Sequence, residues 1–118
     1  MVEEYLAGMV AHNWDRVTST LAASVVRVGP FGDTFTPREP YVAFLRELMP
    51  KLPGYSMEVR RVVAAGSTVV AELTESVEVD GAPLVTPEAL VFDLDGDGRI
   101  AHVAVYLQRL GDVPSAPG

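Results

Sequence analysis

Apolar residues recur every three or four positions in the N-terminal part of the chain, which is the spacing of an amphipathic helix. This pattern predicts helices over residues 2–12, 14–21 and 39–49. Asn13 precedes the second helix and can cap it, and Pro40 suits the first turn of the third. We therefore expect three helices, the first two forming a hairpin.

From residue 55 onward the pattern changes to an alternation of apolar and polar residues, which indicates strands joined by tight turns. The expected strands cover residues 25–28, 55–65, 69–79, 84–94 and 100–110. Helices that come mostly before strands indicate an α+β fold with an antiparallel meander, rather than alternating α/β. We expect a single domain over residues 1–110, followed by a Gly/Pro/Ser-rich, flexible C-terminal tail over residues 111–118.

Two glutamates interrupt otherwise apolar strand faces. Successive side chains on a strand point to opposite faces, so Glu75 shares a face with Leu73, and Glu88 shares one with Leu90 and Phe92. Each glutamate is thus predicted to be a single carboxylate within an apolar face.

Arg27 lies among apolar neighbours on the first strand, where a cation needs a partner or water. A Gly/Pro-broken loop follows and carries Phe31 and Asp33, an arrangement typical of small-molecule pockets. One interpretation places Arg27, Glu75 and Glu88 in an apolar cavity, where two carboxyl groups can divide acid and base roles. The other is a structural salt bridge, or strand faces assigned one residue out of phase.

Composition narrows the class of protein. The chain has 118 residues, of which 48% are hydrophobic, and a net charge of −7. This acidic balance argues against nucleic acid or an anionic membrane surface as a partner, since both require a basic footprint. No apolar run reaches the roughly 20 residues of a membrane span. Glu3 and Glu4 occupy the place of a basic signal-peptide region, so a cytoplasmic location is expected.

No metal site is predicted. The chain has no cysteine, and His12 and His102 lack the spacing of a zinc site. Asp93 begins a segment similar to the first half of a calcium-binding EF-hand loop, but Ala104 occupies the position that requires a bidentate glutamate. A hairpin turn is therefore favoured there.

The last strand is apolar on both faces, with Val103 and Val105 on one and Ala104 and Tyr106 on the other. In so small a domain, a second apolar face suggests a partner chain, and we expect a homodimer.

The order of elements resembles the nuclear transport factor 2-like superfamily, which includes ketosteroid isomerases, limonene epoxide hydrolases and SnoaL-like polyketide cyclases. The resemblance covers about residues 2–110 and depends on the segments 5–9, 12–15, 26–32 and 86–92. It implies a cone-shaped (cystatin-like) fold, with three N-terminal helices packed on a curved antiparallel sheet around one deep pocket.

Within this resemblance, Tyr5 corresponds to the oxyanion-hole tyrosine of ketosteroid isomerase, and Glu88 lies at or next to its protonated carboxylic acid. The aspartate that serves as the base of that family is Gly29 here, followed by Pro30. An ordinary steroid isomerase is therefore not implied. Asp33, in the same loop, could replace the base only if the loop folds inward.

The epoxide hydrolase pattern is also incomplete. Arg27 takes the place of a pocket tyrosine, Gly29 that of an asparagine and Val105 that of a pocket aspartate. Arg27 with Glu75 and Glu88 offers a similar set of charges from other positions. The SnoaL-like cyclases carry an acid on the final strand, which this chain lacks.

We predict a SnoaL-like enzyme that performs cofactor-free acid/base chemistry, of isomerase, cyclase or epoxide-hydrolase type, on a small apolar metabolite in an enclosed pocket. The alternatives are a non-catalytic ligand-binding or dimerisation module, or a structural assembly subunit. The expected catalytic residues are Tyr5, Arg27, Glu75 and Glu88. The expected substrate-binding residues are Trp14, Phe31, Asp33, Phe44, Met49, Leu73, Leu90, Phe92, Val103 and Val105.

Overall fold

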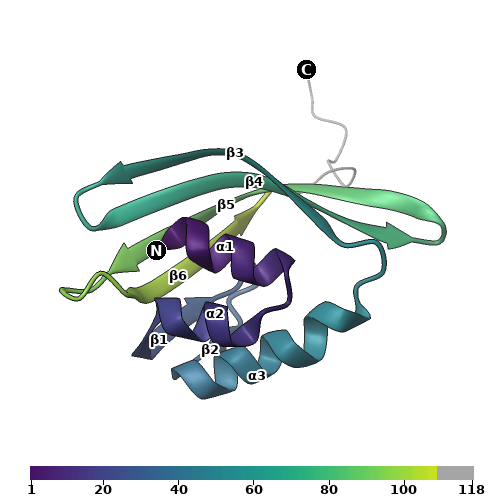
Figure 1. The fold of residues 1–118 in the computed structure, drawn as a ribbon. Coiled ribbons are helices and arrows are strands. Elements are labelled where there is room, and N and C mark those ends of the chain that lie inside the picture. Colours follow the sequence, from purple (N-terminus) through teal and green to yellow (C-terminus); the bar gives the residue numbers. More distant parts are fainter. Residues whose placement is uncertain (109–118) are drawn as a thin grey trace.

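Three helices lie together on one side of a six-stranded sheet in the computed structural model, which describes residues 1–108 (Figure 1). The helices are α1 (Val2–Val10), α2 (Trp14–Thr20) and α3 (Arg38–Leu48), and the short 3-10 helix η1 (Met49–Lys51) continues α3. All three predicted helices are thus present, and the fold class is confirmed. The predicted tail, residues 111–118, lies outside the described residues.

The helical hairpin depends on a cap and on a close approach. The Asn13 side chain accepts a hydrogen bond from the Arg16 backbone N–H at 3.1 Å, as expected for the cap of α2. Gly8 lets α1 lie against α2, since a Cβ atom there would lie 2.9 Å from Val17 Cγ2. This contact fixes α1 in the position from which Tyr5 reaches the interior.

The sheet has the strand order β2-β1-β6-β5-β4-β3. Its strands are β1 (Leu21–Val28), β2 (Thr34–Phe35), β3 (Ser56–Ala65), β4 (Thr68–Val79), β5 (Ala82–Leu94) and β6 (Ile100–Leu107). β1 starts earlier than predicted, directly after α2. β2 was not predicted, because two residues are too short to show an alternating pattern.

One pair of strands departs from the expected antiparallel arrangement. β1 and β6 run parallel, with Arg27 opposite Val103, whereas the pairs from β3 to β6 are all antiparallel. A parallel pair needs a long crossover connection, and here α3 and the whole β3–β5 meander lie between the two strands in sequence. The result places β1, with Arg27, beside the end of the meander.

The face of the sheet that packs against the helices holds the core. Leu73, Leu90, Phe92 and Val103 are buried on it, and Glu75 and Glu88 are partly buried on the same face. The predicted strand faces are therefore in phase. Tyr106 is 61% exposed on the last strand.

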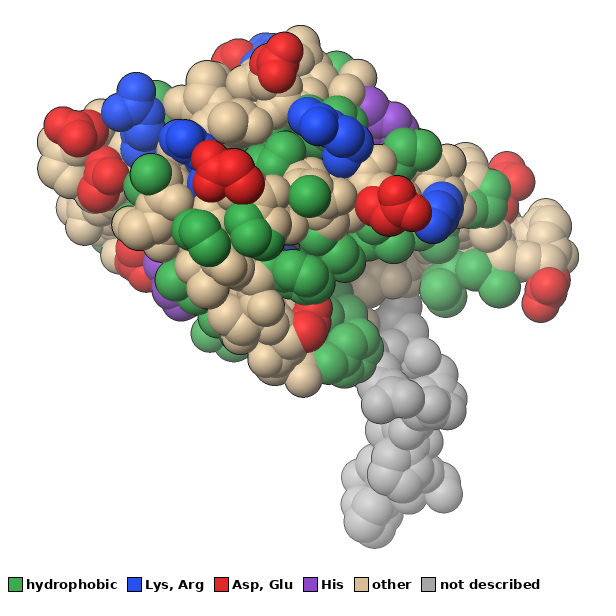
Figure 2. Space-filling model, turned by 90° about the horizontal axis from the view of Figure 1, so that it is seen from below, with side chains coloured by type: hydrophobic (Ala, Val, Ile, Leu, Met, Phe, Trp, Pro, Cys, Tyr) green, Lys and Arg blue, Asp and Glu red, His purple; other side chains and the backbone are tan. Residues whose placement is uncertain are grey.

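The Asp-Gly-rich segment after β5 is a turn, as predicted. Asp95 Oδ1 accepts hydrogen bonds from the backbone N–H groups of Asp97 at 2.9 Å and Arg99 at 3.0 Å. On the helical side of the molecule, basic and acidic side chains are interspersed with hydrophobic ones (Figure 2). Among residues 1–108, no helix is long and apolar enough to cross a membrane.

Candidate active site

A small cavity of about 130 Å³ lies between the helices and the sheet. Its lining comes from α1, β1, α3, η1 and the connection after it, and from β3 to β6. The predicted site residues on this lining are Tyr5, Arg27, Phe44, Met49, Glu75, Glu88, Leu90 and Val105. The structure thus brings together all four predicted catalytic residues, from four different elements.

The two carboxyl groups come from neighbouring strands. In the β4–β5 pair, Leu73 lies opposite Glu88 and Glu75 lies opposite Thr86, so the two glutamates are diagonal neighbours on one face. Diagonal positions are within reach of long side chains. The hairpin therefore places two glutamate side chains next to each other at the wall of an apolar cavity.

These two carboxyl groups cannot both ionise easily. Burial raises the pKa of Glu88 to about 9, and the hydrogen bond and negative charge of Glu75 add to this effect. The positive charge of Arg27 acts in the opposite direction but is the smallest of these effects. At neutral pH Glu88 is therefore a protonated carboxylic acid that can donate a hydrogen bond or a proton.

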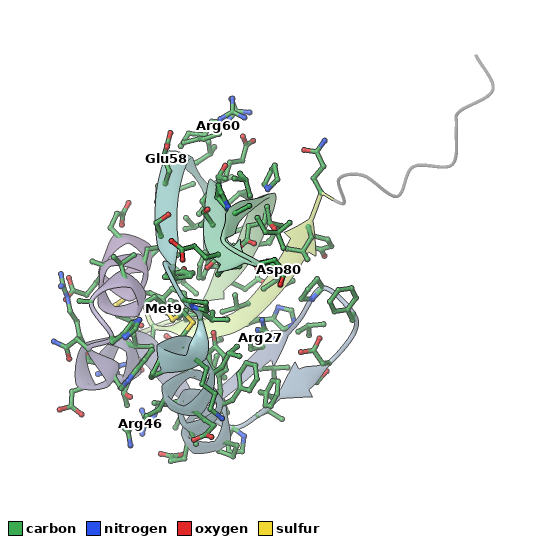
Figure 3. The ribbon with its side chains drawn as sticks, turned by 90° about the vertical axis from the view of Figure 1, so that its right-hand side faces the viewer. Met9, Arg27, Arg46, Glu58, Arg60 and Asp80 are labelled. Carbon is green, nitrogen blue, oxygen red and sulfur yellow. The ribbon has the colours of Figure 1, made fainter. Side chains whose placement is uncertain are left out.

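Arg27 supplies the positive charge of the site. Its guanidinium forms an ion pair with Asp33 Oδ2 at 3.0 Å, and its side chain is only 14% exposed. The Cζ atom lies 5.6 Å from the centroid of the Phe44 ring, which stacks on Phe35. In Figure 3 Arg27 lies inside the molecule, whereas Glu58 and Arg60 project outward from β3.

Gly29 leaves room for this ion pair. A Cβ atom at Gly29 would lie 2.6 Å from Arg27 Nη1 and would also collide with the Asp33 carboxylate. Asp33, considered above as a substitute base, is bound to Arg27 and does not line the cavity.

Tyr5 is fully buried, and its hydroxyl shares a hydrogen bond with that of Tyr41. Burial is the main cause of the raised pKa of both hydroxyls, so both remain protonated. The Tyr5 ring also packs edge-on against Phe92, with centroids 5.4 Å apart. Tyr5 therefore presents a neutral hydroxyl at the cavity wall.

Glu75 has a hydrogen-bond donor that the sequence did not reveal. The Tyr55 hydroxyl donates to Glu75 Oε2. Burial, followed by the charge of Glu75, raises the pKa of Tyr55, so the tyrosine stays protonated. The available signal was that Tyr55 shares the two-residue period of Met57, a lining residue.

The structure places six predicted substrate-binding residues away from the cavity, namely Phe31, Asp33, Leu73, Phe92, Val103 and Trp14. Leu73, Phe92 and Val103 point to the inner face as expected, but they are fully packed in the core. Trp14 lies on α2, which contributes no lining residue, and stacks on His12. Lining residues beyond those predicted are Leu6, Met9, Tyr41, Leu45, Leu48, Leu52 and Met57.

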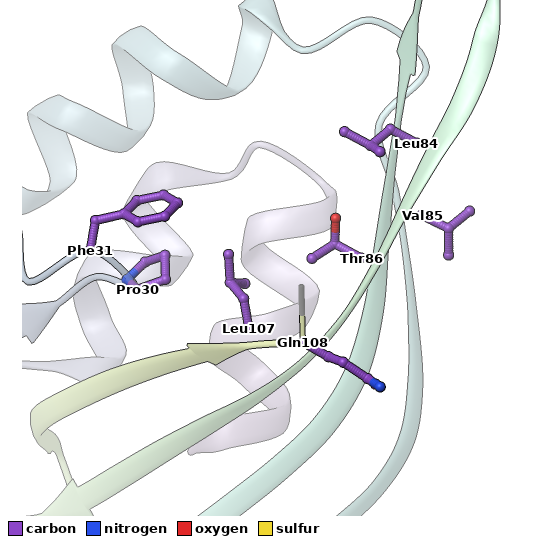
Figure 4. A pocket seen from close by; sticks show the side chains of 7 residues that line it. All are labelled: Pro30, Phe31, Leu84, Val85, Thr86, Leu107 and Gln108. Carbon is purple, nitrogen blue, oxygen red and sulfur yellow. The ribbon is translucent and has the colours of Figure 1, made fainter. Parts of the chain in front are cut away.

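A second hollow, the outer groove, lies at the end of the sheet nearest the Phe31 loop (Figure 4). It measures about 480 Å³ and is lined by Pro30, Phe31, Leu84, Val85, Thr86, Leu107 and Gln108. Phe31 is 84% exposed there and does not reach the cavity. Leu107 pairs with Glu88 across β5 and β6, so the groove borders the residues of the cavity.

Solved structures confirm the architecture. The chain superposes on an LEH-like epoxide hydrolase from M. tuberculosis with a TM-score of 0.78 at 23% identity, covering 91% of this chain and 79% of that one. A ketosteroid isomerase-like protein from Catenulispora acidiphila, bound to trimethylamine, gives a TM-score of 0.78 at 20% identity, covering 89% and 82%. A candidate SnoaL-like polyketide cyclase from Shewanella denitrificans gives 0.80 at 11% identity, covering 91% and 87%.

These likenesses define the fold class, which is three helices on a curved sheet in the nuclear transport factor 2-like fold. The sequence profile of the SnoaL-like domain matches residues 2–103, so the chain belongs to the SnoaL-like family. No curated protein sequence gives a significant match. The resemblance stated from the sequence is thereby confirmed.

Proposed function

We propose that this chain is an enzyme that performs acid/base chemistry, without a cofactor, on a small and largely apolar metabolite. The observation that supports this most strongly is the Glu75–Glu88 pair at the wall of the cavity. A raised pKa keeps Glu88 protonated beside the Glu75 carboxylate. Such a pair offers a proton donor and a proton acceptor at the same pH.

The other polar groups suit the stabilisation of negative charge. Arg27 and Tyr5 line the same cavity as the two glutamates. If a proton leaves carbon, or a ring opens, the charge that develops on a substrate oxygen can be met by a guanidinium and a neutral hydroxyl. Isomerisation, cyclisation and epoxide opening all require proton transfer and the stabilisation of negative charge on oxygen.

The dimensions of the two hollows suggest how a substrate binds. The cavity of about 130 Å³ accommodates only a compact group, whereas the outer groove of about 480 Å³ is larger and partly apolar. We propose that a polar, oxygen-bearing end of the substrate enters the cavity and that the apolar remainder lies along the groove. Phe31 and Leu84 would then contact the substrate body.

A second candidate is a non-catalytic ligand-binding module. Two observations favour it: Arg27 is already paired with Asp33, and the Tyr5 hydroxyl is already bonded to Tyr41. The ketosteroid isomerase base is also replaced by Gly29. In this alternative the same cavity binds a ligand, and the glutamates contribute affinity without turnover.

The deciding experiment identifies small molecules that co-purify with the protein, by native mass spectrometry, and then measures turnover of that compound class against pH. We expect kcat to fall as the pH rises through about 9, because Glu88 loses its proton there. Glu75→Gln and Glu88→Gln should each lower kcat by about 100-fold or more. Glu58→Gln, an exposed glutamate on β3, is the matched control. Turnover that survives both cavity substitutions would contradict the assignment of the chemistry to the glutamate pair, and a wild-type protein that binds the compound without turnover would favour the binding module.

We also propose that the chain forms a homodimer through the outer face of the sheet. Support comes from exposed apolar side chains on the strands, including Val63, which is 55% exposed, and Tyr106, which is 61% exposed. Light scattering coupled to size-exclusion chromatography tests this, and Tyr106→Glu should shift the mass from dimer to monomer. A monomeric wild-type protein would refute the proposal.

A further inference from the structure

Tyr55 occupies a place that bears directly on the two glutamates. It lies between η1 and β3, one residue before β3 begins, and it is partly buried. Its hydroxyl donates to Glu75 Oε2. Among the side-chain hydrogen bonds between residues 1–108, this is the one that a tyrosine makes to a carboxyl group.

We propose that Tyr55 is a positioning residue that holds Glu75 as the ionised member of the carboxyl pair and so leaves the shared proton on Glu88. Glu75 is then the general base and Glu88 the general acid. The assignment of catalytic roles rests on the proposed function. The location of the proton is a property of the free protein and can be measured without a substrate.

The physical argument compares two arrangements of one proton. When the proton is on Glu88, the Tyr55 hydroxyl donates to a charged carboxylate, which is a strong hydrogen bond. When the proton is on Glu75, the same hydroxyl faces a neutral acid, and the charge-assisted part of the bond is lost. A hydrogen bond to a charged group favours the first arrangement by about 10- to 100-fold.

The other polar groups near the two glutamates do not determine which of them carries the proton. Arg27 favours ionisation of Glu88, but its guanidinium is held in an ion pair by Asp33. Tyr5 and Tyr41 are neutral and bonded to each other. The raised pKa of Tyr55 itself keeps its hydroxyl a donor over the working range of pH. Burial already favours the proton on Glu88, and Tyr55 adds to this preference because its hydroxyl donates to Glu75.

The test is a pH titration of the protein labelled with ¹³C at the glutamate side-chain carboxyl carbons, followed by NMR. Glu75→Gln and Glu88→Gln assign the two signals. In the wild-type protein we expect the titration step near pH 9 to appear on the Glu88 carbon. A step that appears on Glu75 instead overturns the proposal without any further variant.

Tyr55→Phe removes the hydroxyl and keeps the ring. We expect the ratio of proton on Glu88 to proton on Glu75 to fall by about tenfold or more, so that both carbons report the upper step. The lower of the two titration steps, at which the pair acquires its first negative charge, should move up by about one pH unit or more. The reason is that this charge has lost the hydrogen bond from the Tyr55 hydroxyl. Tyr106→Phe, at an exposed tyrosine on β6, is the matched control and should leave both steps unchanged.

An unchanged titration in a folded Tyr55→Phe protein would overturn the positioning role, even if the glutamate substitutions abolish turnover. A shifted titration, combined with full turnover in both glutamate variants, would support the location of the proton and refute the catalytic role of the glutamate pair. The two failures are thus distinguishable. Where both proposals hold, Tyr55→Phe should lower kcat and shift its pH profile, with a smaller change in KM.

Discussion

Glu88 should make the stability of this protein depend on pH in a way that one substitution removes. Burial next to Glu75 raises the pKa of Glu88 from 4.5 to about 9. Below pH 4.5 the carboxyl is protonated in both the folded and the unfolded chain, and it costs nothing. Between pH 4.5 and about 9 the folded chain holds a proton on Glu88 that the unfolded chain has released, so stability falls as the pH rises.

The size of the effect follows from the shift. One pKa unit corresponds to about 1.4 kcal/mol, which gives an upper bound of about 6 kcal/mol for the whole window. The carboxyl is only partly buried, so solvent screens much of this, and we expect about 2–3 kcal/mol. Glutamine mimics the protonated acid in shape and carries no charge. Glu88→Gln should therefore match the wild-type protein near pH 5 and exceed its free energy of unfolding by about 2–3 kcal/mol near pH 9.

Urea denaturation from pH 5 to 9, followed by the fluorescence of Trp14, measures this difference. All other side chains are common to the two proteins, so their contributions cancel in the comparison. Glu58→Gln, an exposed glutamate on β3, is the control and should run parallel to the wild type. If the Glu88→Gln and wild-type curves are also parallel, Glu88 is ionised in the folded protein and the reasoning fails.

Two further substitutions test the supports of the site. Gly8→Ala should destabilise the protein by about 1–3 kcal/mol, because the added methyl group collides with Val17, and thermal denaturation would show the loss. Asp33→Ala should cost about 1–2 kcal/mol, between the values for exposed and buried pairs, because it leaves the largely buried Arg27 without its carboxylate. Prior replacement of Arg27 by Met should remove most of that loss in a double-mutant cycle, and an undiminished loss would argue against the ion pair.

The sequence was sufficient for the elements and their inward faces, since both follow from local periodicity. It could not show whether an inward-facing residue lines the cavity or is packed in the core. Leu90 and Phe92 share a face, yet Leu90 lines the cavity, whereas Phe92 lies against the Tyr5 ring in the core. The difference depends on which helix covers each part of the strand, and this is a property of the assembled fold.

Non-local pairing explains the other differences. The parallel β1–β6 pair and the short β2 depend on segments that are distant in sequence or too short to show a pattern. The alternating pattern predicts Tyr55 as the first residue of a strand. Its hydrogen bond to Glu75, which lies 20 residues further along the chain, depends on how the strands pair and cannot be predicted from the local pattern. Arg27 lies near Glu75 and Glu88 because the parallel pairing places β1 next to β6.

Both glutamates belong to a single hairpin, whereas the residues of the outer groove are shared with a surface loop. The spacing of the acid pair is thus fixed by a continuous ladder of backbone hydrogen bonds, and Pro30 and Phe31 can vary without disturbing it. The shape of the outer groove and the geometry of the acid pair can therefore change independently of each other.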